Sequence, residues 1–389
     1  PPSPFPAMWA RPPLYMAVVP IVLVLASLVP LSLGQCSSSS VSVAADQTGA
    51  CGATPMSRVA AGDDYLFTAA CHVDASSVLY VYRCNKDGTD CVSHLQDAQT
   101  DACTHPHIEI DPVAGRYYIA MEHVIFSNSM YLFSCSFNFT SCYAVQIEPF
   151  AQAAKRPAVV ADPANNRVFV ASPAQYNSNH LHVHRCINGG QSCDLTVDVS
   201  TLASQGINSG LAPSIAYDSV TSTVYIAVQN NFAVTNRAFV FNCNDDLSAC
   251  SIHNASGGAV DESGIEPSIA IDEVGRLVYV ATTDTRSAES KARVVVCDMN
   301  ISSCTGYDIS PTNNAVSNVN IALNAADLVF YVSYINEGAS GFLWLSRCST
   351  VDFSCTDELV EANSGTAYAN VDVDTTVSPP KVYTSFADS

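Results

Sequence analysis

The chain has 389 residues, with 36 acidic against 16 basic side chains and a formal net charge of −20 at pH 7. A chain this acidic is poorly suited to nucleic acid or anionic membranes, so we expect neither as a partner. Hydrophobic residues make up 48% of the chain, which is enough to fill a large core, and its 16 cysteines favour an oxidising compartment.

The first predicted element is an apolar segment at residues 16–34. Its short core, interrupted by Pro20 and Pro30, and its small residues at the end are typical of a secretory signal peptide. The alternative is that this segment is an N-terminal membrane anchor. We expect membrane contact only through this segment or through sequence beyond the C-terminus. We therefore divide the chain into a leader and signal peptide, 1–34, and a secreted or cell-surface repeat domain, 35–389.

The repeat domain contains six cysteine pairs in which six residues separate the two members, at a period of roughly 50 residues. We interpret each pair as a disulfide across a β-hairpin, because facing residues in a hairpin lie close enough to be bridged. Zinc is the rival interpretation, although zinc sites use closer spacing. The pairs are Cys84/Cys91, Cys135/Cys142, Cys186/Cys193, Cys243/Cys250, Cys297/Cys304 and Cys348/Cys355.

Each repeat reads as four short strands. The first ends in Asp or Asn, which can accept hydrogen bonds from its own turn, and the second is rich in Val, Ile, Tyr and Phe. The third leads into the first cysteine of the pair, and the fourth starts at the second cysteine. Four-stranded units of this length predict an all-β fold, a β-propeller of antiparallel blades. The Asp or Asn positions are 63, 111, 162, 218, 272, 324 and 374.

The two ends of the repeat domain are incomplete repeats. Cys36 and the residues after it resemble the fourth strand of a repeat, whereas the last segment, from about Tyr368, resembles a first and second strand. Propellers commonly close by sharing a blade between the termini. We therefore expect six complete blades and a seventh composite blade, in a fragment truncated at its C-terminus. The pairing of Cys36, Cys51, Cys71 and Cys103 stays open, with Cys51–Cys103 and Cys71–Cys103 both possible.

Ligands of propellers usually meet the face where the first strands begin. The residues at these starts vary within a constant frame, which is expected of a recognition surface; they are His105, Arg156, Ala212, Glu266, Asn318 and Tyr368. Second-strand ends and neighbouring loops extend this face. The candidate ligand-binding residues are His105, His107, Glu122, His123, Arg156, Glu266, Asp284 and Glu337, with His72 beside them.

Three places invite a metal hypothesis. His105, His107 and His123, with Glu122, could hold a transition metal or supply an acid–base pair, although surface histidines in loops are commoner. The alternating His180, His182 and His184 share one strand face, where packing against the next blade is the preferred interpretation. The Asn85, Asp87 and Asp90 hairpin is similar to a calcium loop, but turn chemistry explains it better. We predict no cofactor, since no phosphate loop, G-x-S-x-G or H-E-x-x-H motif occurs.

Three N-glycosylation sequons agree with secretion, at Asn138, Asn254 and Asn300. The segment PSIAIDEVGRLVYVATTD, Pro267–Asp284, resembles the repeats of secreted sialidase-like and YVTN-like propellers. The resemblance implies the propeller fold. Sialidases also carry Asp-box turns, which this chain lacks, and three arginines that bind the substrate carboxylate, of which Arg58 and Arg156 match two positions.

We therefore predict an extracellular propeller that binds or scaffolds a protein or glycan. The rivals are a glycan hydrolase or lyase that uses Arg58, Arg156, Glu122 and Glu266, and a metal-dependent enzyme at the histidines of the second repeat. A hydrolase would need two carboxylates about 5–9.5 Å apart across a pocket.

Overall fold

The structure is a computed structural model. It describes residues 50–58, 65–72, 78–86, 89–97, 104–123, 129–148, 156–174, 180–203, 209–230, 237–255, 263–285, 290–310, 316–337, 341–361, 366–375 and 380–388. All of these residues belong to one compact unit, Ser40–Ser389. The predicted signal segment, the boundary at residue 34, Cys36 and Cys103 lie outside the described residues.

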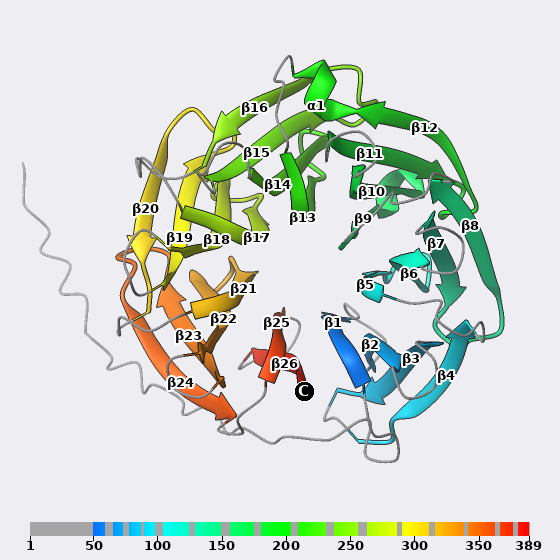
Figure 1. Cartoon of the computed structure of the whole chain (residues 1–389), viewed down its shortest axis with the longest axis horizontal. Helices are drawn as coiled ribbons and strands as arrows, with labels where there is room; N and C mark the ends of the chain where they lie inside the picture. The colour runs from blue at the N-terminus through cyan, green and yellow to red at the C-terminus, as the bar shows by residue number, and fades with distance from the viewer. Residues whose placement is uncertain are drawn as a thin grey trace, which may run out of the picture. The chain divides into compact units, whose positions relative to one another are not determined.

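Six four-stranded antiparallel sheets and one two-stranded sheet surround a central axis as blades (Figure 1). Consecutive strands pair in chain order, so the first strand of each four-stranded blade is innermost and the fourth is outermost. Blade one is β1–β4 (Ala50–Arg58, Tyr65–His72, Val78–Asn85, Val92–Asp97) and blade two is β5–β8 (Thr104–Asp111, Arg116–His123, Ser129–Ser136, Cys142–Glu148). Blade three is β9–β12 (Ala158–Asp162, Arg167–Ala174, His180–Ile187, Ser192–Asp198), with the short helices η1 (Pro163–Asn165) and α1 (Val199–Leu202).

Blade four is β13–β16 (Ser209–Asp218, Thr223–Asn230, Arg237–Asn244, Cys250–Asn254), and blade five is β17–β20 (Ser263–Asp272, Leu277–Asp284, Lys291–Asp298, Cys304–Asp308). Blade six is β21–β24 (Val316–Asn324, Val329–Asn336, Phe342–Ser349, Cys355–Glu361). The last sheet has only β25 (Thr366–Asp374) and β26 (Lys381–Asp388). The all-β propeller with four-stranded antiparallel blades is thus confirmed. The described residues form the six expected complete blades, but only a two-stranded sheet where a seventh, composite blade was expected.

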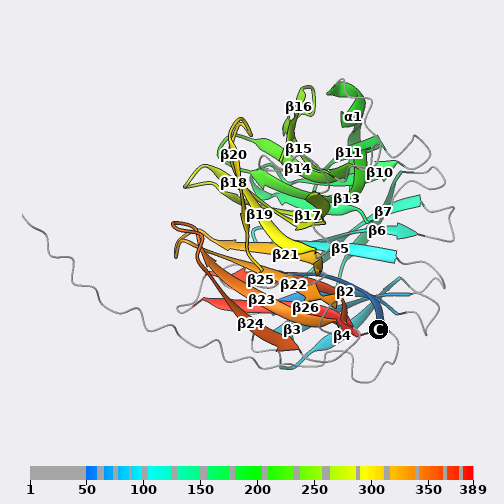
Figure 2. The same cartoon turned by 60° about the vertical axis from the view of Figure 1, so that its left-hand side comes forward.

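The position of a strand within its blade explains its composition. Second strands are covered by neighbouring blades on both faces, and all eight residues of β22 are buried. Such strands need a continuous apolar sequence. Fourth strands lie at the outer rim, and β16 has only half-buried and exposed residues. Figure 2 shows the blades from the side.

The hydrophobic core lies between blades. Phe67 of blade one packs on Tyr117 of blade two with ring centroids 5.3 Å apart. Tyr279 of blade five packs on Phe330 of blade six at 5.7 Å. Each interface buries large side chains whose removal from water contributes about 1.5–3 kcal/mol each. The blades are therefore held in their ring by face-to-face packing.

The β25–β26 hairpin lies between blade six and blade one (Figure 1). Val371 and Val373 of β25 join a core cluster with Tyr331 of blade six. On the other side, Asp374 Oδ2 lies 3.2 Å from Lys86 Nζ of blade one, and Tyr383 Oη donates a hydrogen bond to the Lys86 carbonyl at 2.9 Å. The two ends of the repeat series therefore meet.

The acidic residue that ends the first strand organises the turn that follows it. Asp272 Oδ1 accepts hydrogen bonds from the backbone N–H groups of Val274 at 3.0 Å and Gly275 at 2.7 Å. Asp111 and Asp218 cap their turns in the same way. The predicted turn chemistry is confirmed, and these carboxylates are structural.

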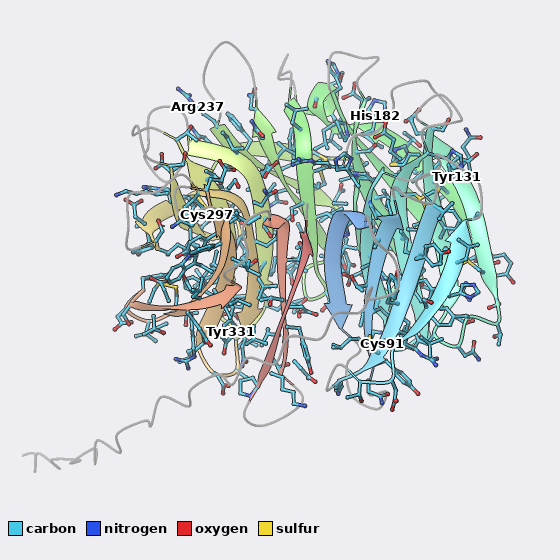
Figure 3. All side chains as sticks on the ribbon, turned by 60° about the horizontal axis from the view of Figure 1, so that its bottom comes forward. Cys91, Tyr131, His182, Arg237, Cys297 and Tyr331 are labelled. Atoms are coloured by element: carbon cyan, nitrogen blue, oxygen red, sulfur yellow. A yellow bond between two sulfur atoms is a disulfide. The ribbon has the colours of Figure 1, made fainter. Side chains whose placement is uncertain are left out.

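All six predicted disulfides are present, with Cα–Cα distances from 3.7 to 4.1 Å. They pin the hairpin between the third and fourth strands at the outer rim (Figure 3). Because these cysteines are bonded in pairs, they are not zinc ligands. The bonds are Cys84–Cys91, Cys135–Cys142, Cys186–Cys193, Cys243–Cys250, Cys297–Cys304 and Cys348–Cys355.

Two of the six hairpins, those that contain Cys91 and Cys193, differ from the predicted start of the fourth strand at the second cysteine. In blade one, β4 starts one residue after Cys91, so this cysteine lies in the turn rather than in the strand. In blade three, β12 starts one residue before Cys193, and the ladder has a register shift between Arg185 and Cys186 that accommodates the earlier start. The predicted strand starts are therefore wrong at Cys91 and Cys193, although both disulfides form as predicted.

A seventh disulfide position involves the first strands of blade one. Cys71 is disulfide-bonded, and the β1–β2 register places Cys51 directly opposite it. This pairing is one that the sequence interpretation did not weigh, because it considered Cys103 as the partner of either residue.

Disulfides of this number are typical of secreted and extracellular proteins. Among the described residues, no helix is long and apolar enough to span a bilayer.

Candidate functional site

The inner strands of blades two to six share an unusual backbone conformation at their start. In each of these blades one non-glycine residue, within the first four positions of the strand or, for Arg156, two residues before β9, has a left-handed φ. These residues are His105 (45°), Arg156 (57°), Ala212 (48°), Glu266 (49°) and Asn318 (51°). We call these five residues the mouth ring. In four blades the ladder has a register shift beside this residue, so the strand contains a β-bulge. Bulges redirect side chains and are frequent next to functional sites.

This conformation is costly. A left-handed L-residue costs roughly 1–2 kcal/mol, and a following proline favours extended backbone instead. Four of the five mouth-ring residues precede proline. Glycine would relieve the strain, yet every position carries a side chain. Such outliers persist where the surrounding structure enforces them, and they concentrate at binding and catalytic sites.

One ion pair spans the mouth ring. Arg156 Nη1 bonds to Glu266 Oε1, and the two residues come from blades three and five. Blade four, which lies between them, contributes the small Ala212. The side chains of Arg156 and Glu266 are 35% and 23% exposed, so both remain accessible to a ligand.

The candidate residues of blade two do not form the predicted cluster. His107 Nδ1 accepts a hydrogen bond at 3.3 Å from the Val159 N–H of blade three. Burial lowers the pKa of His107 to about 4, so the ring is neutral at neutral pH. His123 is buried beside Tyr131, with ring centroids 5.2 Å apart, and Glu122 is buried as well. Glu122 and His123 therefore belong to the packed interior, whereas His105 and His107 are half-buried.

The other candidates are dispersed. Asp284 is buried at the end of β18, 3.7 Å from Arg293 Nη1, whereas Glu337 is exposed after β22. The side chains of Arg58, His72 and Tyr368 lie outside the described part of the molecule. Of the predicted site residues, the structure brings Arg156 and Glu266 into direct contact.

The central channel holds a cavity of ≈ 640 Å³. Its lining comes from the far halves of the inner strands and from the turns that follow them, including Glu109, Tyr217, Asp272 and Glu273. It therefore lies toward the opposite end of the channel from the mouth ring. Part of its acidic lining is already engaged, because Glu273 Oε1 accepts the Ser219 N–H at 2.6 Å.

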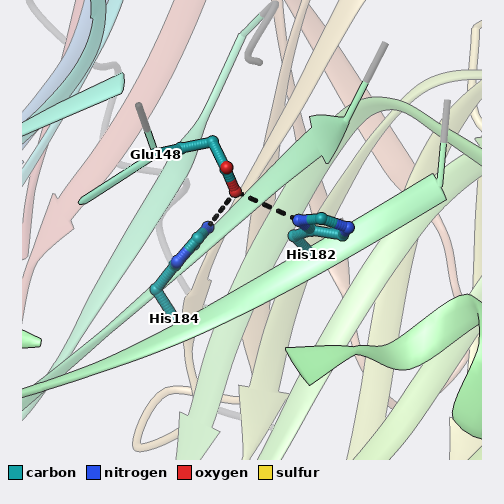
Figure 4. Close-up of side chains that lie close together, drawn as sticks. All are labelled: Glu148, His182 and His184. Atoms are coloured by element: carbon teal, nitrogen blue, oxygen red, sulfur yellow. Dashed lines mark hydrogen bonds and ion pairs between the residues drawn. The ribbon is translucent and has the colours of Figure 1, made fainter. Parts of the chain in front are cut away.

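A separate cluster lies between blades two and three (Figure 4). Glu148 Oε2 is 3.1 Å from His182 Nδ1 and 3.7 Å from His184 Nε2, and all three residues are buried. Burial lowers the pKa of His184 to about 4, with Glu148 opposing that shift. Within the described residues this is the one group of three potential metal ligands.

The third histidine of that strand and the calcium-like hairpin have other roles. His180 Nδ1 lies 2.8 Å from Asp198 Oδ2, away from the cluster. Asn85 Nδ2 donates to Asp90 Oδ2 at 3.1 Å across its own hairpin, as turn chemistry predicts, while Asp87 lies outside the described residues.

Sequence reasoning missed Glu148. Its weak signal was the acidic or amide residue that ends most fourth strands, such as Asp198, Asn254 and Asp308. In blade three and blade five this carboxylate bonds to the third strand of its own blade, through Asp198–His180 and Asp308–Arg293. Glu148 instead reaches the next blade, which local patterns do not reveal.

No protein-family model matches this chain, and no curated protein matches it in sequence. Similar solved structures include a polysaccharide lyase, ulvan lyase, bound to a saccharide, with a TM-score of 0.59 and 7% identity over 87% of this chain and 94% of that chain. The β-propeller domain of the trilobed protease from Pyrococcus furiosus has a TM-score of 0.51 and 8% identity, covering 87% and 97%. Raptor from Chaetomium thermophilum has a TM-score of 0.52 and 9% identity, covering 84% of this chain and 27% of that one.

At these identities the likeness concerns the fold alone. It agrees with the propeller resemblance of the repeats, and it spans proteins as different as a lyase, a protease domain and Raptor, so the fold does not select one activity.

Proposed function

We propose that this chain is an extracellular propeller that binds a glycan or a protein at the mouth ring. The observation that carries the proposal is the left-handed residue that starts five inner strands, because each blade keeps a costly backbone while changing the side chain that it presents. A constant frame with variable side chains supports recognition. A purely structural ring would favour glycine at these positions.

A glycan is the preferred ligand class. Arg156, Glu266, Asn318 and His105 offer half-exposed hydrogen-bonding groups of both kinds, which suit a hydroxyl-rich ligand. The net charge of −20 disfavours heavily sulfated chains, so we propose a neutral or weakly acidic glycan. The ulvan lyase, whose solved structure is bound to a saccharide of GlcA and Rha3S, is an example of the same fold holding a glycan, although that glycan is more acidic than the one proposed here.

Binding to a panel of neutral and uronic-acid oligosaccharides tests the proposal. Arg156→Ala and Glu266→Ala should each weaken binding about tenfold or more, since each removes one charged partner at the mouth. The matched control is Val274→Ala, a 90% exposed residue at the other end of the channel, which should bind as the wild type does. Equal binding by all four proteins would contradict the proposal, and saturable binding of proteins but not saccharides would move the ligand to the protein class.

A glycan hydrolase or lyase is the second candidate. It is favoured by one observation, an arginine next to a carboxylate at the mouth. Its other sequence-based carboxylate, Glu122, is buried in β6, which weakens the pair that a hydrolase needs. Shortening of a bound oligosaccharide by the wild type, abolished by Glu266→Gln, would establish catalysis; unchanged saccharide after long incubation supports binding alone.

We also propose that residues 16–34 direct secretion and that the protein is glycosylated. Asn138, Asn254 and Asn300 are exposed, and Asn138 and Asn300 lie in outer hairpin turns where a glycan points into solvent. Enzymatic removal of N-glycans from secreted protein should lower its mass. No mass change, or retention of residues 16–34 in the mature protein, would contradict this part.

The seventh blade remains a proposal. Its support is the hairpin β25–β26, which occupies a blade position between β21 and β1. We propose that the segment after Cys36 adds its outer strand. Cross-linking of residues 36–47 to β26 supports this assignment, and their attachment elsewhere would contradict it.

A further inference from the structure

The interface between blades two and three contains a polar cluster that the mouth ring does not use. Glu148 ends β8, the outer strand of blade two, and His182 and His184 alternate on β11, so both imidazoles share the face of blade three that meets blade two (Figure 4). Elsewhere, core clusters between blades are built mainly from aliphatic and aromatic side chains. Burial of two imidazoles and a carboxylate costs free energy unless an interaction in the folded protein compensates for the lost hydration.

The spacing of the three groups suits a metal ion. Their ligand atoms all lie within 4.8 Å of one another, and the two distances to Glu148 Oε2 are 3.1 and 3.7 Å. Zinc bonds of about 2.0–2.2 Å in a tetrahedral site separate ligand atoms by roughly 3.3–3.5 Å. Small side-chain movements would thus place all three atoms around one ion.

The surroundings support the imidazole geometry. His184 Nδ1 lies 2.9 Å from Thr196 Oγ1, a hydrogen bond that holds the ring and leaves Nε2 facing Glu148. Metal-bound histidines commonly use their second nitrogen in this way. Ser172 Oγ, 3.5 Å from His184 Nε2, is a hydroxyl beside the site that can hold a water in the fourth position.

We propose that Glu148, His182 and His184 bind one Zn²⁺ that joins blade two to blade three. Two nitrogens and one carboxylate oxygen favour zinc over Ca²⁺ or Mg²⁺, which prefer oxygen ligands alone. The six rim disulfides each close a hairpin within one blade, so the ion would supply a link between blades that they do not. The site is independent of the mouth ring.

Wild-type protein, secreted and purified without chelator, provides the first test. Elemental analysis should find about one zinc per chain, and X-ray absorption at the zinc edge should show nitrogen and oxygen ligands with imidazole scattering. Absence of stoichiometric zinc after dialysis against Zn²⁺, or a sulfur shell around the metal, would overturn the proposal. This measurement needs no variant, so it stands even if core substitutions prevent folding.

Three variants locate the site. Glu148→Gln and His182→Gln should lower the affinity for Zn²⁺ at least tenfold, whereas His180→Gln should bind as the wild type does, because His180 bonds to Asp198. Zinc at a hundredfold excess over Kd should raise the Tm of the wild type and of His180→Gln by about 5 °C, and that of the other two much less. Equal zinc affinity in all three folded variants, or a loss confined to His180→Gln, would contradict the assignment.

Discussion

The outer hairpins and the mouth ring both contain a residue with left-handed backbone, but its role differs between the two places. Each contains a left-handed residue that recurs from blade to blade, and most of these residues are not glycine. At the rim the residue lies in a turn closed by a disulfide. In two blades its ring packs on a neighbouring ring: Phe353 stacks on Tyr307 with centroids 3.8 Å apart, and Phe139 stacks on His94 at 4.8 Å. At the mouth, the equivalent device presents side chains that differ in every blade.

The difference shows how a repeat protein separates stability from recognition. The rim disulfide is the same in every blade, although the left-handed residue beside it varies from the exposed Asp90 to the buried Leu247. Loss of a rim disulfide therefore removes a covalent contact. Mouth residues are half-exposed, so their replacement removes little packing. We call the rim hairpins, the turn caps and the packed strands the frame. Substitutions in the frame should therefore change the free energy of unfolding, and substitutions in the mouth ring should change ligand binding.

Asp218 is the frame position at which we expect the largest effect. It is fully buried, caps its turn through Val220, and accepts a hydrogen bond at 2.9 Å from Arg276 Nη1 of blade five. Asp218→Ala should lower the free energy of unfolding by about 3 kcal/mol, because it leaves the Val220 N–H and the Arg276 cation without their partner. Urea unfolding measures this, with Asp246→Ala in an exposed turn as the control, which should change stability little. Equal losses for the two variants would contradict the assignment.

Removal of one rim disulfide should have the next largest effect. For Cys243→Ala with Cys250→Ala, opening an eight-residue loop predicts a loss of about 2.5 kcal/mol. Blade packing should survive, since the bridge is local, so near-ultraviolet circular dichroism should keep its native form. A complete loss of folding, or peptide mapping that links Cys84 to Cys142 in the wild type, would refute local stapling.

Acid should weaken the frame through His107. Its folded-state pKa of about 4 lies below the unfolded value of about 6.5, so the unfolded chain binds more protons between these values. Stability is therefore fully present above about pH 6.5 and falls as the pH is lowered toward 4, by about 2 kcal/mol at pH 5. His107→Gln, which keeps an acceptor for Val159, should show a correspondingly smaller loss between pH 7 and pH 5. An unchanged pH dependence would show that folding does not lower the pKa of this ring.

The mouth should affect stability least. Arg156 and Glu266 form a partly exposed pair, so Arg156→Ala should lower the free energy of unfolding by less than about 1 kcal/mol. Thermal unfolding checks this, and a loss comparable to that of a rim disulfide would place Arg156 in the frame.

The sequence predicted what repeats. The cysteine spacing identified every rim disulfide. Asp111 and Asp272 predicted the turns that follow them, because each carboxylate accepts a hydrogen bond from a backbone N–H only two residues away. The starts of the inner strands were located only to within three residues, since β13 begins at Ser209 rather than Ala212 and β17 at Ser263 rather than Glu266. The left-handed backbone at Ala212 and Glu266 was not predicted. The fourth-strand starts at Cys91 and Cys193 were each misplaced by one residue, because a disulfide fixes which residues are bonded and not where the strand ladder begins.

Contacts between residues on different blades were harder to predict from the sequence. The sequence could not show that His107 bonds to blade three, that Arg156 reaches Glu266 across a blade, or that Glu148 meets His182, since each depends on how separate sheets pack. Strand alternation placed His182 and His184 on one face correctly, but their partner lies 34 residues away from His182 along the chain, on another blade.

A double-mutant cycle at Arg156 and Glu266 tests the separation of frame and mouth most directly, with both binding and unfolding measured on the same proteins. We predict that each single variant and the double variant lose oligosaccharide binding about tenfold or more, while their free energies of unfolding stay within about 1 kcal/mol of the wild type. Full binding by the double variant, or a loss of binding that only follows a loss of folding, would contradict the account.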